Sequence, residues 1–442
     1  MLGSTSDGSA GGGTTATTDT DSGPDAGDDT SGSATNATTS AGSGSDDDDD
    51  GSDTDTDTGS VLEVCNGALA PLGMLAGNEG VVSDQYEVRL PVGGMAGRML
   101  DHCGSSVNAL FTAMSHSENN FGVTEFPLWN IWSEQDPAVT VLESGPAVVR
   151  MRVDWAVNVD VDPEDEAYGT STYTFIADGR IVRDEDLVYS EATNDTMQNW
   201  LTAYLALEPN RFTQVEVRGD ADITSAVDQQ EPAFDIFNGQ PSQDVTFCAR
   251  HEASDDVVGF TGRRDSDVTT EWNGLRATEA EFFGPRSLSF IGDFETGNGV
   301  GGDNITPGTY RGYFLTTLGG NPGADCARVH EHGAEFLSPS WLVTEGGTYD
   351  SFHDFSGAHL LSVSEAGDLT VQIPVGSAMP SVLFDVADYS RSELQVAGVA
   401  FNGTPLEEDT QFITQFGSDR GHWILVGQRL VGGDEITITY VE

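Results

Sequence analysis

The chain has 442 residues and a net charge of −55, and all 18 of its basic residues are arginines. Because nucleic acids and anionic membranes are themselves polyanions, this charge argues against binding to either of them. The absence of lysine excludes a P-loop and the Schiff-base chemistry of lysine enzymes. No apolar run approaches the length of a membrane-spanning helix, so we expect no membrane-spanning segment.

Residues 1–60 consist almost entirely of Gly, Ser, Thr and Asp. Such a segment has too few apolar side chains to offset the entropy lost on ordering, so we predict a disordered linker. It contains 14 of the 73 acidic residues and no base, so the remainder, with 59 acids and 18 bases, still carries −41. This balance suits a salty environment, where screening weakens charge repulsion. A tail of this composition commonly follows an export signal, so we predict a secreted or cell-surface protein.

The four cysteines are Cys65, Cys103, Cys248 and Cys326. Their wide spacings do not suit a zinc site and favour two disulfides in an exported protein. Four cysteines allow three pairings, of which we predict Cys65–Cys103 and Cys248–Cys326.

From residue 61 onward, short runs of alternating apolar and polar residues predict an all-β fold. The segment 171–190 contains two strands, because Asp178-Gly179 is a strong hairpin signal. Residues 105–115 are the one candidate for a helix. The strands expected before the last hundred residues lie at 86–92, 147–159, 171–190, 212–219, 287–292, 309–318 and 326–337.

Two segments are candidates for ligand binding. Aromatic rings are platforms for sugar rings, and Trp129 and Trp132 lie in a segment with weak strand character, so we select them as glycan-binding candidates. Burial in the core is the alternative for each ring. Asp160, Asp162 and Glu164 are candidate calcium ligands, although an acidic hairpin tip is the favoured interpretation. The predicted chemistry requires no cofactor.

Part of the sequence resembles a known family. The runs ESGPAVVRMRVDW, YTFIADGRIVRDEDLVY and WLTAYLALEP resemble the sheet segments of the galactose-mutarotase-like β-supersandwich, a fold of many polysaccharide lyases and sugar-processing enzymes. The chain's end, with its Asn402-Gly403 turn, is similar to the small β-sandwich that often follows. The resemblance implies a large antiparallel β-supersandwich followed by a small C-terminal β-sandwich. A change of composition around residues 344–357 sets their expected bounds at 61–345 and 346–442.

The segment VHEHGAEF (329–336) places two histidines around a glutamate. In a strand, Arg328, His330 and His332 would share one face, and Glu331 and Glu335 the other. Two such histidines can bind zinc, but nothing nearby supplies further ligands. We expect 326–337 to pair with 309–318 as an antiparallel hairpin. Depending on register, either Tyr310 or Arg311 with Tyr313 would then lie beside the histidines.

Tyrosine, histidine and arginine together suit β-elimination of a uronate polymer, which needs a base, an acid and a positive group beside the carboxylate. The lyases that the chain resembles use Tyr and His for the first two tasks. We therefore predict a lyase acting on an acidic polysaccharide. Its catalytic residues would be Tyr313 or Tyr310 with His332, supported by His330, and its substrate-binding arginines Arg311, Arg328, Arg263 and Arg264.

Two alternatives remain open from the sequence. The first is a non-catalytic glycan-binding or surface protein that binds through Trp129 or Trp132. The second is a hydrolase or mutarotase-like isomerase that uses a histidine with Glu331 or Glu335. The expected strand alternation separates these acids from the histidines, which ranks the second alternative lower.

Overall fold

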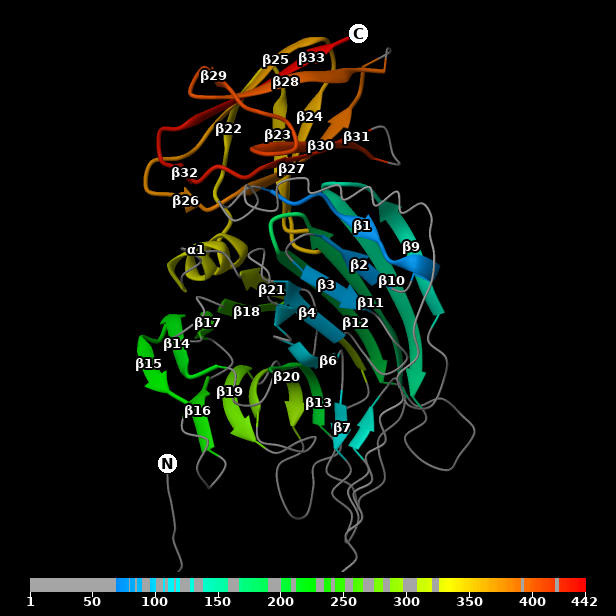
Figure 1. The fold of residues 1–442 in the computed structure, drawn as a ribbon, viewed down its shortest axis with the longest axis vertical. Helices are drawn as coiled ribbons and strands as arrows, with labels where there is room; N and C mark the ends of the chain where they lie inside the picture. The colour runs from blue at the N-terminus through cyan, green and yellow to red at the C-terminus, as the bar shows by residue number, and fades with distance from the viewer. Residues whose placement is uncertain are drawn as a thin grey trace, which may run out of the picture. The chain divides into compact units, whose positions relative to one another are not determined.

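The residues that the structure describes lie between positions 69 and 442. The predicted linker 1–60, Cys65, Cys103, Trp132 and the calcium candidates lie outside them. The computed structural model (Figure 1) describes residues 69–78, 80–83, 86–89, 96–100, 106–107, 110–114, 117–119, 128–130, 138–157, 167–189, 200–207, 212–227, 234–239, 243–250, 257–264, 274–280, 287–296, 308–319, 326–390, 393–417 and 421–442.

The described fold is mostly β, with one α-helix. Its largest sheet is antiparallel and has nine strands, which Figure 1 shows from β9 to β15. In spatial order these strands are β15 (Ile223–Ala226), β14 (Gln214–Gly219), β17 (Val245–Arg250), β18 (Val257–Arg264), β21 (Gly308–Gly319), β12 (Arg180–Tyr189), β11 (Ala167–Ile176), β10 (Val148–Val157) and β9 (Ala138–Ser144).

Three smaller sheets come from the same part of the chain. A five-stranded sheet contains β16 (Phe234–Asn238), β19 (Gly274–Ala280), β20 (Ser287–Thr296), β13 (Trp200–Leu207) and β6 (Leu110–Met114). A second contains β1 (Gly73–Met74), β2 (Gly80–Val82), β3 (Tyr86–Arg89), β4 (Ala96–Leu100) and β5 (Ser106–Val107), with a 3-10 helix at Ala76–Asn78. The third pairs β7 (Ser117–Asn119) with β8 (Leu128–Asn130).

The large sheet has two distinct faces. Its inner face packs against the five-stranded sheet that contains β20, through stacked rings such as Phe247 and Phe290, whose centroids lie 5.1 Å apart. Because side chains alternate along a strand, residues 181, 183 and 185 of β12 lie on this inner face, and residues 180, 182 and 184 lie on the outer face.

The segment 326–337 is the α-helix α1 (Cys326–Leu337), so the predicted strand is wrong. Its buried residues Cys326, Val329, Gly333 and Phe336 recur at intervals of three and four, which is the helical period. This stripe packs against β17 and β18 on the outer face of the large sheet (Figure 1). The predicted hairpin between 309–318 and this segment is therefore wrong as well.

Two other predictions, a disulfide and a turn, are confirmed, and a third, a helix, is wrong. The disulfide Cys248–Cys326 is confirmed and ties the first residue of α1 to β17. The turn Asp178-Gly179 joins β11 to β12, with Gly179 at a φ of 91°. The helix considered for 105–115 is not formed, because strands β5 and β6 occupy this segment.

The remaining strands follow α1. One sheet contains β22 (Val343–Glu345), β25 (Gly367–Gln372), β33 (Glu435–Val441), β28 (Gln395–Phe401) and β29 (Thr404–Pro405). Another contains β23 (Thr348–His353), β24 (Ala358–Val363), β27 (Val382–Asp388), β31 (Gly421–Val426) and β30 (Phe412–Phe416), with β24 and β27 parallel. A two-stranded sheet pairs β26 (Ala378–Met379) with β32 (Leu430–Val431). Positive φ angles at Asn402 and Gly403 confirm the turn predicted there.

Side chains from the C-terminal strands complete the structure around the large sheet. Gln415 Oε1 accepts hydrogen bonds from the backbone amides of Ala147 and Val148, at 3.1 and 2.9 Å. Trp423 Nε1 donates to Glu143 Oε1 at 2.7 Å. Within the described part of the chain, no helix has the length and apolar character that crossing a membrane requires.

The packing of α1 leads to a test at Gly333. Alanine would favour an isolated helix by about 1 kcal/mol, but a Cβ at Gly333 would lie 2.0 Å from Thr246 Oγ1. We expect Gly333→Ala to lower the free energy of unfolding by about 1–3 kcal/mol in urea titrations, because the helix must shift. Adding Thr246→Ala should restore part of the loss. A single variant at least as stable as the wild type would contradict the packing of α1.

Candidate functional site on the outer face of the large sheet

Three neighbouring strands bring polar side chains together on the outer face. Antiparallel pairing aligns Asp184 of β12 with Tyr313 of β21, and Tyr313 with Arg263 of β18. Arg311 lies on the same face of β21, two residues before Tyr313, and Arg152 of β10 continues the row beyond β11. We call these five residues the outer strip. It contains three of the residues selected from the sequence, namely Tyr313, Arg311 and Arg263.

The centre of the outer strip combines a phenol, a carboxyl and a guanidinium. The guanidinium carbon of Arg311 lies 5.4 Å from the centre of the Tyr313 ring, and Tyr313 is almost fully buried. Arg311 Nη2 lies 3.4 Å from Asp184 Oδ2, which is a long contact for an ion pair. Burial raises the pKa of Asp184, and the charges of Glu185 and Asp186 act in the same direction although Arg311 opposes them. Asp184 is therefore a carboxyl suited to exchange a proton.

The turn after β23 covers one side of the outer strip. Arg263 Nη1 lies 2.5 Å from Asp354 Oδ1 and donates to the carbonyl of Phe336, at the end of α1, at 3.2 Å. Thr174 Oγ1 donates to the carbonyl of Phe355 at 3.1 Å. These contacts fix the turn against β11 and β18.

The same turn brings in a histidine that the sequence analysis missed. Burial lowers the pKa of His353, and the nearby charge of Arg150 lowers it further. In the sequence, His353 lies in TEGGTYDSFHDFSG, which marks the change to the C-terminal strands. Only a contact between distant segments connects it with the sheet.

Several predicted residues lie elsewhere. Tyr310 occupies the inner face, because it pairs with Leu187. The backbone of Arg264 pairs with Gly312, and the structure does not describe the Arg264 side chain. Trp129 belongs to β8, and the structure does not describe its side chain. Arg328, like both histidines, is on α1.

His332 lies in a small cavity beside the outer strip. It is 3% exposed and lines a cavity of about 20 Å³. Glu335, His359 and Arg180 line the same cavity. In a helix, residues 332 and 335 lie on the same side, so the separation expected from strand alternation is wrong. Glu335 Oε1 lies 3.3 Å from His359 Nε2. A cavity of this volume accommodates one water-sized group and no sugar ring.

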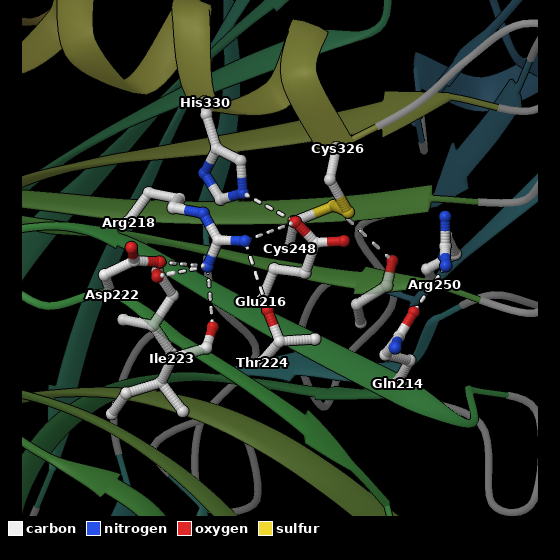
Figure 2. Close-up of polar contacts among 12 residues, drawn as sticks. Gln214, Glu216, Arg218, Asp222, Ile223, Thr224, Cys248, Arg250, Cys326 and His330 are labelled. Atoms are coloured by element: carbon white, nitrogen blue, oxygen red, sulfur yellow. Dashed lines mark hydrogen bonds and ion pairs between the residues drawn. A yellow bond between two sulfur atoms is a disulfide. The ribbon is translucent and has the colours of Figure 1, made fainter.

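His330 lies on a different side of α1. Figure 2 shows its ring above Glu216 and beside the disulfide, with Nε2 3.8 Å from Glu216 Oε2. The ligand atoms of Glu216, Cys326 and His330 lie within 4.8 Å of one another, a spacing compatible with a metal ion. However, the sulfur of Cys326 is bonded to Cys248, and Arg218 Nη2 lies 3.1 Å from Glu216 Oε2. In this oxidised form, only Glu216 and His330 of the three remain as ligands, fewer than a zinc site needs.

No protein-family model matches the sequence, and no curated protein does. Several solved structures do match. A galactose mutarotase related enzyme from Lactobacillus acidophilus is 9% identical over 55% of this chain and 98% of its own, with a TM-score of 0.35. A GalM/aldose epimerase homologue from C. elegans is 9% identical over 58% and 100% of the two chains, with a TM-score of 0.34.

Heparan sulfate lyase HepC from Pedobacter heparinus also matches, with 9% identity over 54% of this chain and 26% of its own and a TM-score of 0.24. The matches include a galactose mutarotase related enzyme, whose name is that of the fold the sequence resembles. At 9% identity and with TM-scores below 0.5, these similarities give no argument for the activity of this chain.

The buried position of His332 leads to a test of pH dependence. Burial, reinforced by Arg180, holds the pKa of His332 well below its ordinary 6.5 although Asp178 opposes the shift. The unfolded chain then binds a proton that the folded chain does not, so stability falls as the pH decreases below 6.5. We expect the stability difference between wild type and His332→Gln to change by up to about 1.4 kcal/mol per pH unit in this range. Parallel curves from urea titrations at pH 5–8 would contradict this burial.

Proposed function

We propose that the protein is an exported polysaccharide lyase that binds a uronate-containing glycan across the outer strip and cleaves it by β-elimination without a cofactor. One observation carries this proposal. The register of β12, β21 and β18 aligns Asp184, Tyr313 and Arg263, with Arg311 beside them. This set contains groups that exchange protons and cations that hold a carboxylate.

The reaction assigns a task to each group. Arg311 and Arg263 bind the uronate carboxylate and stabilise the negative charge that develops on it. Tyr313 and Asp184 act as base and acid: one removes the proton alpha to the carboxylate, and the other protonates the leaving glycosidic oxygen. A carbon–carbon double bond forms as the carbon–oxygen bond breaks. In this proposal Asp184 takes the task that the sequence analysis assigned to His332, because His332 lines the neighbouring cavity.

The ion pair between Arg311 and Asp184 is compatible with an anionic ligand. The contacts between Arg311 and Asp184 are 3.4 Å long, and burial raises the pKa of Asp184. A substrate carboxylate can therefore replace Asp184 at Arg311 while Asp184 accepts a proton. The negative charge of the rest of the chain repels the glycan only over about 8 Å at physiological salt, and over less in brine.

The first test compares two tyrosines of the same strand. Tyr313→Phe removes the hydroxyl from the outer strip, whereas Tyr310→Phe removes a buried hydroxyl from the opposite face. We expect Tyr313→Phe to lower kcat by about 10²–10⁴-fold and Tyr310→Phe to leave it nearly unchanged. The measurement is the absorbance of unsaturated uronate ends over a panel of acidic glycans at low and high salt.

Other outcomes of the glycan panel would indicate other functions. New reducing ends without absorbance would indicate a hydrolase, and binding without product would indicate a glycan-binding protein. Equal activity of the two tyrosine variants would exclude Tyr313 from catalysis.

The second test compares two arginines of similar exposure on the same sheet. The side chains of Arg311 and Arg218 are 36% and 35% exposed, and each is ion-paired. Removing a charge-assisted bond to the substrate carboxylate costs about 1.5–3 kcal/mol, so we expect Arg311→Gln to raise KM about 10–100-fold. Arg218→Gln, on β14, should retain the wild-type KM. Equal KM values for both variants would contradict carboxylate binding by Arg311.

A further inference from the structure

Two buried cationic or proton-bearing side chains converge on the cavity beside α1. Arg180 and His332 are 7% and 3% exposed, and both line the cavity. Within the described part of the chain, Arg180 Nη2 and His332 Nε2 are buried and have no hydrogen-bond partner. Such atoms cost free energy unless an occupant of the cavity binds them.

The acidic groups around the cavity are already hydrogen-bonded. Asp178 accepts hydrogen bonds from the Arg180 side chain, at 2.8 Å, and from the hydroxyl of Ser381. Glu335 accepts from the backbone amide and the hydroxyl of Ser340, at 2.6 and 2.8 Å, and contacts His359. The two atoms that still need a partner are therefore a guanidinium donor and an imidazole nitrogen.

The charged groups around these two atoms include two guanidinium groups and two carboxylates. Arg180 and Arg328 both act on His332 and on Asp178. The carboxylates of Asp178 and Glu335 already accept hydrogen bonds. Burial keeps His332 neutral, with one ring proton that Nε2 can carry toward the cavity. The pair Glu335–His359 closes another wall of the cavity.

The volume limits what the anion can be. A cavity of about 20 Å³ accommodates a single water-sized group, so polyatomic anions such as phosphate or a sugar carboxylate are too large. We propose that this cavity is a halide-binding site, in which Arg180 Nη2 and His332 Nε2 donate hydrogen bonds to a chloride or bromide ion. The acidic composition of the chain suits a saline environment, where chloride is abundant.

The site would link three segments of the chain. Arg180 begins β12, and His332 is in the middle of α1. Ser381 lies between β26 and β27, and Val382 begins β27. Because only the folded chain brings these segments together, a bound halide stabilises the folded form in proportion to its occupancy.

Bromide provides the direct test. Crystals of the full chain grown in sodium bromide should show an anomalous bromine peak in the cavity, within about 3.5 Å of Arg180 Nη2 and His332 Nε2. Bromide peaks at surface arginines alone, or a cavity with no anomalous signal, would overturn the proposal, since water would then be the occupant.

Thermal unfolding provides a second test that needs no crystals. At pH 8 and equal concentrations, sodium chloride should raise Tm relative to sodium gluconate by about 2–4 °C more in the wild type than in His332→Leu. His422→Leu is the matched control, because His422 is also buried and its Nε2 also lacks a partner in the described structure. This control should keep the wild-type response to chloride. Equal responses in all three proteins would contradict the proposal, and the bromide experiment decides the matter if His332→Leu fails to fold.

Discussion

Side-chain alternation in β12, β21 and β18 determines which residues lie on each face of the large sheet. The inner face of these strands contributes rings to one core, where Phe260 stacks on Phe314 with centroids 5.7 Å apart. With the inner residues fixed by packing, the intervening residues must point outward. A slip of one residue in β21 would turn Arg311 and Tyr313 toward the inner face and Phe314 toward the outer face. The apolar core therefore determines where the polar groups of the outer strip lie.

Helix α1 divides the outer face into two chemically different regions. Its first residue is bonded to β17 through the disulfide, and its last turn receives a hydrogen bond from Arg263. Under the helix lies the cavity around Arg180, which is too small for a sugar. Beside the helix, the outer strip contains Arg263 and Arg311, whose side chains are partly exposed. The division separates a site for a small occupant from a surface able to contact a polymer.

The strands of the large sheet were predictable because their local pattern agrees with their environment, as in the hairpin at Asp178-Gly179. The helix α1 was not, because CARVHEHGAEFL fits both periods: its histidines are two residues apart, while Cys326, Val329 and Phe336 follow a helical spacing. The grouping of Tyr313 with Arg311 follows from one strand. Its grouping with Arg263 depends on the pairing of distant strands, which periodicity cannot reveal.

The contact of Gln415 with the backbone of β10 has a consequence for how this protein evolves. Two amides at the start of a buried strand, those of Ala147 and Val148, find their acceptor in a side chain more than 260 positions later. Trp423 and Leu425 likewise belong to the core of the large sheet. The C-terminal strands therefore cannot be exchanged for an unrelated appended module without leaving amides unpaired and apolar surface open. Recombination at this junction is constrained to pairs of segments that have evolved together.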